Sequence, residues 1–186
     1  MLAIGFDTET TGLTKHPAAK KHLQPKIIEF GAVLIDGTGK IVDSLELLIN
    51  PNEPLEAIIT KITGLTNEKL KGKPTFAEVV DEIAAFFARA DVMFAHNLPF
   101  DYQVLSIELE RIGKADFPWP KIGLCTVQEH FEKYGRRMKL LELYEDVMGE
   151  PLEQTHRALD DVEAMARIVI KEKTIERCIA AAAHKN

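Results

Sequence analysis

The chain has 186 residues, 46% of them apolar and 28% charged, which is the composition of an ordinary globular protein. This composition excludes disordered, collagen-like and disulfide-scaffold proteins. The 23 Lys and Arg against 29 Asp and Glu give a net charge of −6, which argues against a surface coated in basic residues but allows a local basic patch. The length predicts a single domain.

The two cysteines and the N-terminus carry no redox or targeting signal. Cys125 and Cys178 form no CxxC pair, so we expect both to be reduced packing residues. The apolar run from Met1 to Phe6 lacks a basic segment and is cut short by Asp7, which fits neither a signal peptide nor a membrane span. We therefore expect a cytoplasmic protein that does not bind a membrane.

The first part of the chain predicts strands. Residues 2–6 form a short apolar run typical of a buried strand, and residues 26–35 and 41–49 are two more, joined by Asp-Gly-Thr-Gly-Lys. The last two runs predict an antiparallel hairpin. Residues 51–54 and Gly64 are interpreted as a loop and a turn.

The middle of the chain predicts a helix, a strand and a second helix. Residues 75–89 carry apolar side chains at helical spacing, and Thr75 with Glu78 forms a capping-box pattern at their start. Residues 92–95 predict a fourth short strand, after which Asn97 and Pro99 open another helix. This succession indicates a parallel neighbour in the sheet.

The last part predicts helices. Residues 125–134 and 139–148 are interpreted as two modest helices that end before glycines at 135 and 149. From Arg157 an apolar stripe predicts a longer helix, and residues 171–186 are either a further alanine-rich helix or a partly frayed tail. The order of elements indicates an α/β fold with a mixed sheet and no second domain.

The first chemical motif is Asp7-Thr8-Glu9, at the end of the first strand. Side chains alternate along a strand, so Asp7 and Glu9 are expected to point the same way. Two carboxylates on one face can hold a divalent cation such as Mg²⁺, which prefers oxygen ligands. Taken alone the motif is weak, because acids near strand ends are commonly just solvated.

A second motif, His96-Asn97-Leu98-Pro99-Phe100-Asp101, follows the strand at 92–95 and places Asp101 in the first turn of a helix. Strand ends of this kind are where α/β proteins build their sites. Helix capping by Asn97 and the helix dipole would account for Asn97 and Asp101, but they do not account for His96.

In the third motif His156 precedes Asp161 by five residues, which on a helix would separate the two side chains by about 140°. We therefore expect His156 to lie before the helix and to lean toward the site that Asp161 faces. Asp160 is assigned to the solvated side. A surface histidine near a helix start is the alternative interpretation.

At these three places the sequence resembles the histidine-bearing branch (DEDDh) of the DEDD superfamily of 3′-5′ exonucleases. It is similar there to the epsilon proofreading subunit of bacterial DNA polymerase III and to RNase T. The likeness covers residues 2–170, including Ile-Ile-Glu-Phe-Gly-Ala-Val at 27–33, so residues 1–170 would be the exonuclease domain and 171–186 a C-terminal helical tail. The resemblance implies a ribonuclease H-like fold, with a mixed five-stranded sheet flanked by helices.

The resemblance also implies roles for the residues of the site. The residues expected to bind two divalent metal ions, Mg²⁺ or Mn²⁺, are Asp7, Glu9, Asp101 and Asp161. His156 would be the general base, since an imidazole can take a proton from the attacking water near neutral pH. The metal ions would also be needed because crowded carboxylates repel one another. Thr10 and Leu13 would contact the terminal nucleotide, and the further substrate contacts are His96 and Asn97.

Two basic runs are candidates for binding the rest of the strand. Residues 15–26 carry four lysines and no acid, and residues 133–139 carry two lysines and two arginines. The side chains expected to contact backbone phosphates are Lys20, Lys21, Arg136 and Arg137. The alternative is that both runs are solubilising loops.

The predicted function is therefore metal-dependent 3′-to-5′ hydrolysis of single-stranded or frayed nucleic acid, with DNA favoured over RNA and nucleoside 5′-monophosphates released. A 3′-to-5′ exoribonuclease is the nearest alternative, because no residue settles whether the 2′-hydroxyl is read. The others are a catalytically silent module that binds a polymerase or a nucleic acid end, and an unrelated phosphatase or nuclease. A DNA polymerase is a candidate partner by resemblance alone, and the oligomeric state is left open.

Overall fold

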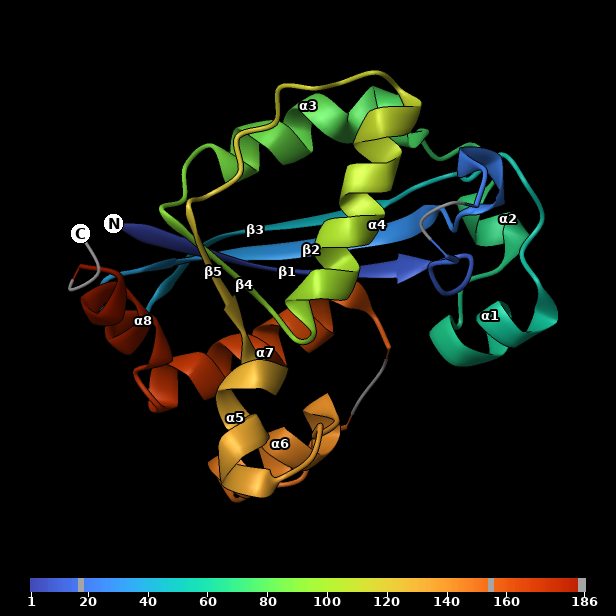
Figure 1. Cartoon of the computed structure of the whole chain (residues 1–186). Helices are drawn as coiled ribbons and strands as arrows, with labels where there is room; N and C mark the ends of the chain where they lie inside the picture. Colours follow the sequence, from blue (N-terminus) through green and yellow to red (C-terminus); the bar gives the residue numbers. More distant parts are fainter. Residues whose placement is uncertain (17–18, 154–155, 184–186) are drawn as a thin grey trace.

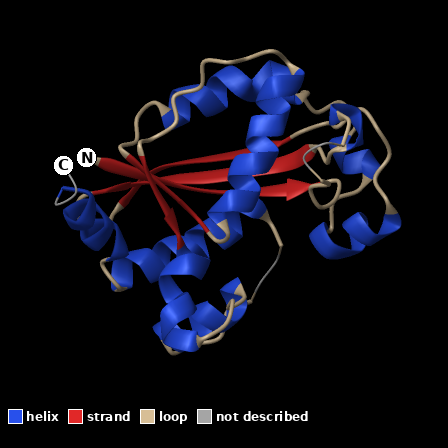
Figure 2. Ribbon diagram, in the orientation of Figure 1, coloured by secondary structure: helices blue, strands red, loops and turns tan. Residues whose placement is uncertain are grey.

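The computed structural model describes residues 1–16, 19–153 and 156–183 as a five-stranded sheet with helices on both faces (Figures 1 and 2). The strand order is β3-β2-β1-β4-β5. Strand β1 pairs antiparallel with β2 and parallel with β4, so the sheet is mixed, as predicted. The strands are β1 (Leu2–Thr10), β2 (Ile27–Asp36), β3 (Ile41–Leu48), β4 (Val92–Ala95) and β5 (Ile122–Cys125).

The helices form two layers around this sheet. In Figure 1, α3 and α4 cover one face, α7 and α8 cover the other, and α1 and α2 lie beyond the carboxyl end of β1. The helices are α1 (Ala57–Thr63), α2 (Asn67–Leu70), α3 (Phe76–Phe87), α4 (Leu98–Arg111), α5 (Thr126–Tyr134), α6 (Leu140–Met148), α7 (Ala158–Lys171) and α8 (Thr174–Ala183). A short 3₁₀ turn, η1 (Lys21–Leu23), lies between β1 and β2. None of the helices in the described ranges is long and apolar enough to cross a membrane.

The hairpin and the capped helix predicted from the sequence are confirmed. Strands β2 and β3 pair antiparallel, and the carboxylate of Asp36 closes their turn by accepting the backbone N–H groups of Thr38 at 2.8 Å and Lys40 at 3.1 Å. At the start of α3 the carboxylate of Glu78 accepts both the backbone N–H and the hydroxyl of Thr75, each at 2.7 Å. These short-range patterns formed as expected because their partners are close in sequence.

One strand and two α-helices were not predicted, and each is short. Strand β5 has four residues, and pairing with β4 stabilises it rather than any pattern of its own. Helices α1 and α2 are seven and four residues long, and they lie on either side of the predicted turn at Gly64, in segments to which the sequence analysis assigned no element. Periodicity is unreadable over such lengths. Helix α1 ends at Gly64, whose φ of 68° is a left-handed conformation that glycine adopts without strain.

The alternation of side chains along β1 and β2 divides the core between the two faces of the sheet. Ile4, Phe6 and Phe30 pack in the cluster that contains α3 and α4, whereas Ala3 and Val33 pack in the cluster that contains α6 and α7. Continuing this alternation along β1 directs residues 7 and 9 toward α7 and residue 8 toward α4. The fold therefore places the first motif between two helices.

The C-terminal segment packs against the domain. Helix α8 places Ile175 and Cys178 against the cluster of α6 and α7. Cys125, at the end of β5, is buried in the core, and both cysteines are thiols, as expected.

Candidate active site

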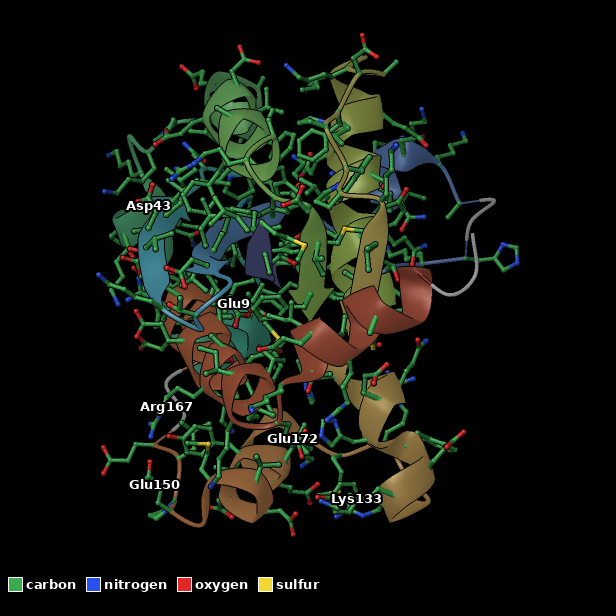
Figure 3. The ribbon with its side chains drawn as sticks, turned by 90° about the vertical axis from the view of Figure 1, so that its left-hand side faces the viewer. Glu9, Asp43, Lys133, Glu150, Arg167 and Glu172 are labelled. Carbon is green, nitrogen blue, oxygen red and sulfur yellow. The ribbon has the colours of Figure 1, made fainter. Side chains whose placement is uncertain are left out.

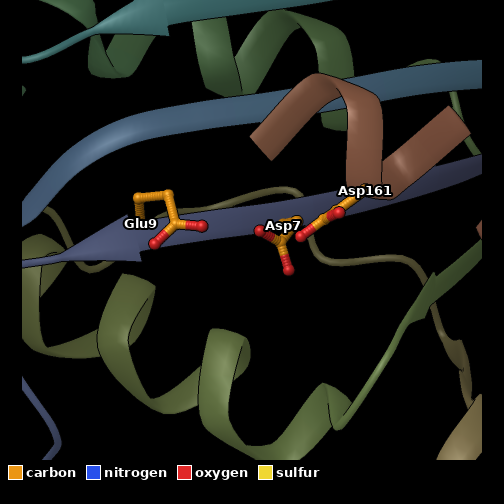
Figure 4. A group of neighbouring side chains, drawn as sticks. All are labelled: Asp7, Glu9 and Asp161. Atoms are coloured by element: carbon orange, nitrogen blue, oxygen red, sulfur yellow. The ribbon is translucent and has the colours of Figure 1, made fainter. Parts of the chain in front are cut away.

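Three carboxylates from distant parts of the chain meet beside the carboxyl end of β1. Asp7 and Glu9 come from β1 and Asp161 from the first turn of α7, and each offers an oxygen that lies within 4.8 Å of the others (Figure 4). Asp161 is almost fully buried, and Asp7 and Glu9 are partly buried. The structure thus brings together the acids of the first and third motifs.

The carboxylate of Asp101 lies alongside this group. Asp101 is on the first turn of α4, is 2% exposed, and its Oδ1 accepts the backbone N–H of Thr8 at 3.1 Å and the Thr8 hydroxyl at 2.8 Å. Because Thr8 separates Asp7 from Glu9, these bonds fix the start of α4 next to the cluster.

Burial raises the pKa values of these carboxylates, and for Asp7 and Glu9 the charges of neighbouring acids raise them further. Burial, and next the charges of Asp101, Glu9 and Asp161, raise the pKa of Asp7 well above its ordinary value. The pKa of Glu9 rises to about 8, chiefly through burial and then through Asp161. Burial also raises the pKa of Asp101 to about 7, against the hydrogen bonds from Thr8, which lower it. Ionised carboxylates at this site therefore lower the free energy of unfolding unless a bound cation offsets their charge.

The donor set fits a divalent metal ion of the hard type. The three converging side chains offer carboxylate oxygens alone, which are the ligands that Mg²⁺ and Mn²⁺ prefer over the nitrogen and sulfur favoured by zinc. A cation among these oxygens would relieve the repulsion that raises the pKa of Glu9. The acidic cluster therefore fits the predicted class of cofactor.

His156 lies before the helix that carries Asp161, as the angular spacing of residues on a helix predicted. Helix α7 begins at Ala158, so His156 precedes the helix, and Asp160 is exposed, as both predictions stated. His156 is itself exposed and has a φ of 53°, a left-handed backbone conformation that is uncommon outside glycine. The residues just before it, 154–155, lie outside the described ranges.

Two charged residues beside the cluster were missed by the sequence analysis. Glu29 on β2 is 0% exposed, and its Oε1 lies 2.8 Å from Nε of Arg157 and 2.6 Å from an Nη of the same guanidinium. Glu29 pairs directly with Glu9 across the β1–β2 ladder. An acid within the apolar run Ile-Ile-Glu-Phe was the available signal, because a buried carboxylate in a central strand needs a cationic partner.

The second motif connects to the basic run at 133–139. Asn97, directly before α4, has a φ of 76°, and its Oδ1 accepts a 2.6 Å hydrogen bond from Arg137. Its side chain makes no capping bond to α4, so the capping interpretation of Asn97 is wrong. The ring nitrogens of His96 lie 2.8 Å from the Thr126 hydroxyl and 3.1 Å from the carbonyl oxygen of Met138. Both His96 and Asn97 thus contact the protein segment that carries Arg137.

A groove of about 580 Å³, lined by both apolar and charged side chains, adjoins the end of β1. The turn after β1 supplies Leu13, which is 80% exposed, and α1 supplies Ile58 and Ile62 to the same groove. The hydroxyl of Thr10 donates to the carbonyl of Gly12 at 2.7 Å, which shapes the turn that presents Leu13. The helix missed from the sequence therefore forms one wall of this groove.

The predicted phosphate contacts lie on exposed segments and are partly engaged with acids. Lys21 lies 3.0 Å from Glu110, and Arg136 lies 2.8 Å from Glu142, with the four side chains between 38% and 62% exposed. Lys20, directly before η1, is exposed. Exposed ion pairs contribute about 0–1 kcal/mol each, so a phosphate can displace them.

The sequence comparisons define the family. The chain belongs to the exonuclease family RNase_T, which matches residues 4–169. The DNA polymerase III PolC-type of Caldanaerobacter subterraneus is 33% identical over 168 residues, covering 90% of this chain and 11% of that protein. The DNA polymerase III subunit epsilon of Treponema pallidum is 33% identical over 157 residues, covering 84% and 69%. The chain therefore spans only 11% of the length of that PolC-type relative.

Solved structures share the fold. The nuclease domain of 3′hExo, a DEDDh family member bound to rAMP, gives a TM-score of 0.75 at 20% identity and covers 93% of this chain and 92% of that one. Exonuclease X in complex with 5′ overhanging duplex DNA gives a TM-score of 0.66 at 23% identity, covering 90% and 89%. These structures confirm the predicted fold, and the match to the exonuclease family over residues 4–169 confirms the predicted class of protein.

Proposed function

We propose that this domain removes nucleotides from the 3′ end of a single-stranded or frayed nucleic acid and releases nucleoside 5′-monophosphates. The observation that carries the proposal is the meeting of Asp7, Glu9 and Asp161 within 4.8 Å, beside Asp101, in a chain of the exonuclease family. DNA is favoured over RNA, because the curated relatives include subunits of DNA polymerase III.

The four carboxylates, Asp7, Glu9, Asp101 and Asp161, would hold two divalent ions, Mg²⁺ or Mn²⁺. When bound, the ions supply positive charge that offsets the charge developing on the phosphate and on the leaving oxygen. The protein contributes an arrangement of acids that is set by β1, α4 and α7 before substrate arrives. Because α4 is tied to Thr8 and α7 to β2, little reorganisation is needed on binding.

His156 would act as the general base. An oxygen of water attacks the phosphorus of the last phosphodiester, the bond from phosphorus to the 3′ oxygen of the preceding nucleotide breaks, and that oxygen takes up a proton from solvent to become a hydroxyl. His156 accepts the proton that the attacking water loses. Its exposed position before α7 suits this role, because the imidazole stays in contact with solvent and can release the proton afterwards.

The groove at the end of β1 would receive the terminal nucleotide. Its volume of about 580 Å³ lies in the range of small-ligand pockets, and the apolar side chains in its mixed lining, Leu13 and Ile58 among them, offer surfaces against which a base can pack. Leu13 would contact the base, and Thr10 would act by shaping the turn. Arg137, held by Asn97, would take a phosphate on the other side of the cluster, with His96 fixing the backbone beneath it. Further phosphate contacts would come from Lys20, Lys21 and Arg136.

A DNA polymerase is the proposed partner, because one relative is a DNA polymerase of PolC type and another is an epsilon subunit. A cytoplasmic location is part of the same proposal, as is the division into an exonuclease domain at 1–170 and a helical tail at 171–186.

The proposal is tested with 5′-labelled single-stranded DNA and RNA of the same sequence, incubated with Mg²⁺ or Mn²⁺. We expect a ladder that shortens from the 3′ end, faster on DNA, and its loss in Asp161→Asn. Asp160→Asn is the matched control, since Asp160 is the exposed neighbour of Asp161. Activity that survives in Asp161→Asn, or cleavage that begins inside the strand, would contradict the proposal. Faster shortening of RNA would contradict only the proposed preference for DNA and would leave the proposed 3′-to-5′ exonuclease activity intact.

A further inference from the structure

The start of α7 rests on β2 at the residues that face the metal-binding acids of β1. In the β1–β2 ladder Glu29 is the partner of Glu9, and Gly31 is the partner of Asp7. A side chain at Gly31 would lie 2.4 Å from the backbone nitrogen of Leu159, so the absence of a Cβ allows the first turn of α7 to pack directly on the strand. The position of α7 relative to β1 is therefore set through β2.

An ion pair between the buried Glu29 and the partly exposed Arg157 links these two elements. Arg157 directly precedes α7, and Glu29 holds its guanidinium through Nε and an Nη, while the other carboxylate oxygen of Glu29 accepts the backbone N–H of Ala158 at 3.3 Å. Arg157 also reaches Glu46 on β3 at 2.8 Å. Glu29 thus binds both the side chain before the helix and a backbone N–H that the helix leaves without an internal partner.

Arg157 is linked directly to the metal-binding acid Asp161. The backbone N–H of Asp161 donates to the carbonyl of Arg157 at 3.0 Å, which closes the first turn of α7. A change in the position of Arg157 is therefore passed directly to Asp161. His156 directly precedes Arg157 in the chain, so the ion pair between Glu29 and Arg157 affects the positions of both His156 and Asp161.

We propose that Glu29 and Arg157 are positioning residues whose ion pair fixes the start of α7 on β2 and so sets the distance of Asp161 from Asp7 and Glu9. The proposal rests on the proposed function, because it treats Asp7, Glu9 and Asp161 as the ligands of a divalent cation. Its consequence is that the affinity for the cation depends on two residues that do not touch it.

This role is distinguishable from a purely electrostatic one. If only charge mattered, removing the positive charge of Arg157 would tighten cation binding, whereas removing the negative charge of Glu29 would weaken it. If the pair acts by position, both changes weaken binding, because each one releases α7 from β2. The two explanations therefore predict opposite signs for Arg157→Met.

The experiment is calorimetric titration of the substrate-free protein with Mn²⁺, for the wild type, Arg157→Met and Glu29→Gln. Arg167→Met is the matched control, because Arg167 lies further along α7 and pairs with Glu150 at the surface (Figure 3). We expect both site variants to bind Mn²⁺ about tenfold more weakly, equivalent to about 1.4 kcal/mol, and the control to bind as the wild type does. Wild-type affinity in either variant, or tighter binding by Arg157→Met, would overturn the proposal.

Two further measurements separate the ways in which the experiment could fail. Circular dichroism checks folding, and if Arg157→Met does not fold, Arg157→Lys takes its place, since lysine keeps the charge but cannot bridge Glu29 and Glu46 with one planar group. Weaker Mn²⁺ binding by Arg157→Lys supports the positioning role, and unchanged binding refutes it. The 3′-shortening assay is run on the wild type in parallel, so that a protein that binds Mn²⁺ but does not shorten DNA or RNA would contradict the proposed function and not the positioning role.

Discussion

Replacing Gly31 with alanine tests how closely α7 must approach the sheet. The added Cβ would lie 2.4 Å from the nitrogen of Leu159, 2.5 Å from the carbonyl carbon of Ala158 and 2.8 Å from its oxygen. Ordinary van der Waals contact begins at 3.4 Å, and backbone atoms cannot rotate away, so the start of α7 must move outward by about 1 Å. We expect the free energy of unfolding to fall by about 1–3 kcal/mol, the usual cost of overpacking.

The same movement should lower activity more than stability. Asp161 moves with the first turn of α7 while Asp7 stays on β1, and a misplacement of about 1 Å can reduce the rate of an enzyme about 100-fold. Urea unfolding measures the first effect, and the rate of 3′ shortening, at a temperature where both proteins are folded, measures the second. Gly37→Ala is the matched control, because a Cβ at Gly37 meets nothing within 4 Å. Wild-type stability and rate in Gly31→Ala would refute this account of the packing.

Three further outcomes are expected. Without metal, the free energy of unfolding should fall as pH rises from about 4 to 8. Burial raises the pKa of Glu9 to about 8 and of Asp101 to about 7, so over this range the folded state retains protons that the unfolded state has lost. Urea unfolding midpoints measured in EDTA that rise with pH over this range would contradict this. Mn²⁺ at 100 times its dissociation constant should stabilise the protein by about 2.7 kcal/mol, measured by thermal unfolding, and this gain should disappear in Asp7→Asn but persist in Asp160→Asn. Leu13→Ala should raise KM for single-stranded DNA, because Leu13 is proposed to contact the terminal base. The melting temperature should not change, because Leu13 is 80% exposed. An unchanged KM would show that Leu13 does not contact the substrate.

The accuracy of the sequence analysis followed how clear a pattern each element carries: the four apolar residues of β4 were recognised as a strand, although β4 is short. Residues 76–87 bury one face over three turns, so their helix was readable from spacing and from the capping pair of Thr75 and Glu78. Strand β5 was missed because Gly123 interrupts its four residues, whereas those of β4 are all apolar. Helix α1 was missed because seven residues repeat too few positions to distinguish helix from loop. The oversight at α1 matters for function, since Ile58 and Ile62 form one wall of the groove beside the site.

The candidate site divides in the same way. The acids at 7 and 9 share a face by the alternation of a strand, and His156 had to precede the helix of Asp161 by the angle between residues on a helix, so both relations were available from local geometry. The interpretation of Asn97 as a cap failed because Arg137, forty residues away, binds the side chain instead. Glu29 and Arg157 were overlooked because they are 128 residues apart, and the role of each depends on its ion pair with the other, which the sequence does not show.

The sequence by itself determined which chemical groups are present, which of them share a strand or precede a helix, and the family to which their spacing belongs. The tertiary structure decided how near those groups come to one another: the sheet order places β2 beside β1, Gly31 allows α7 to rest on that pair, and Glu29 anchors it there. The reason is physical, because backbone periodicity acts over a few residues, whereas the approach of two segments depends on every side chain packed between them.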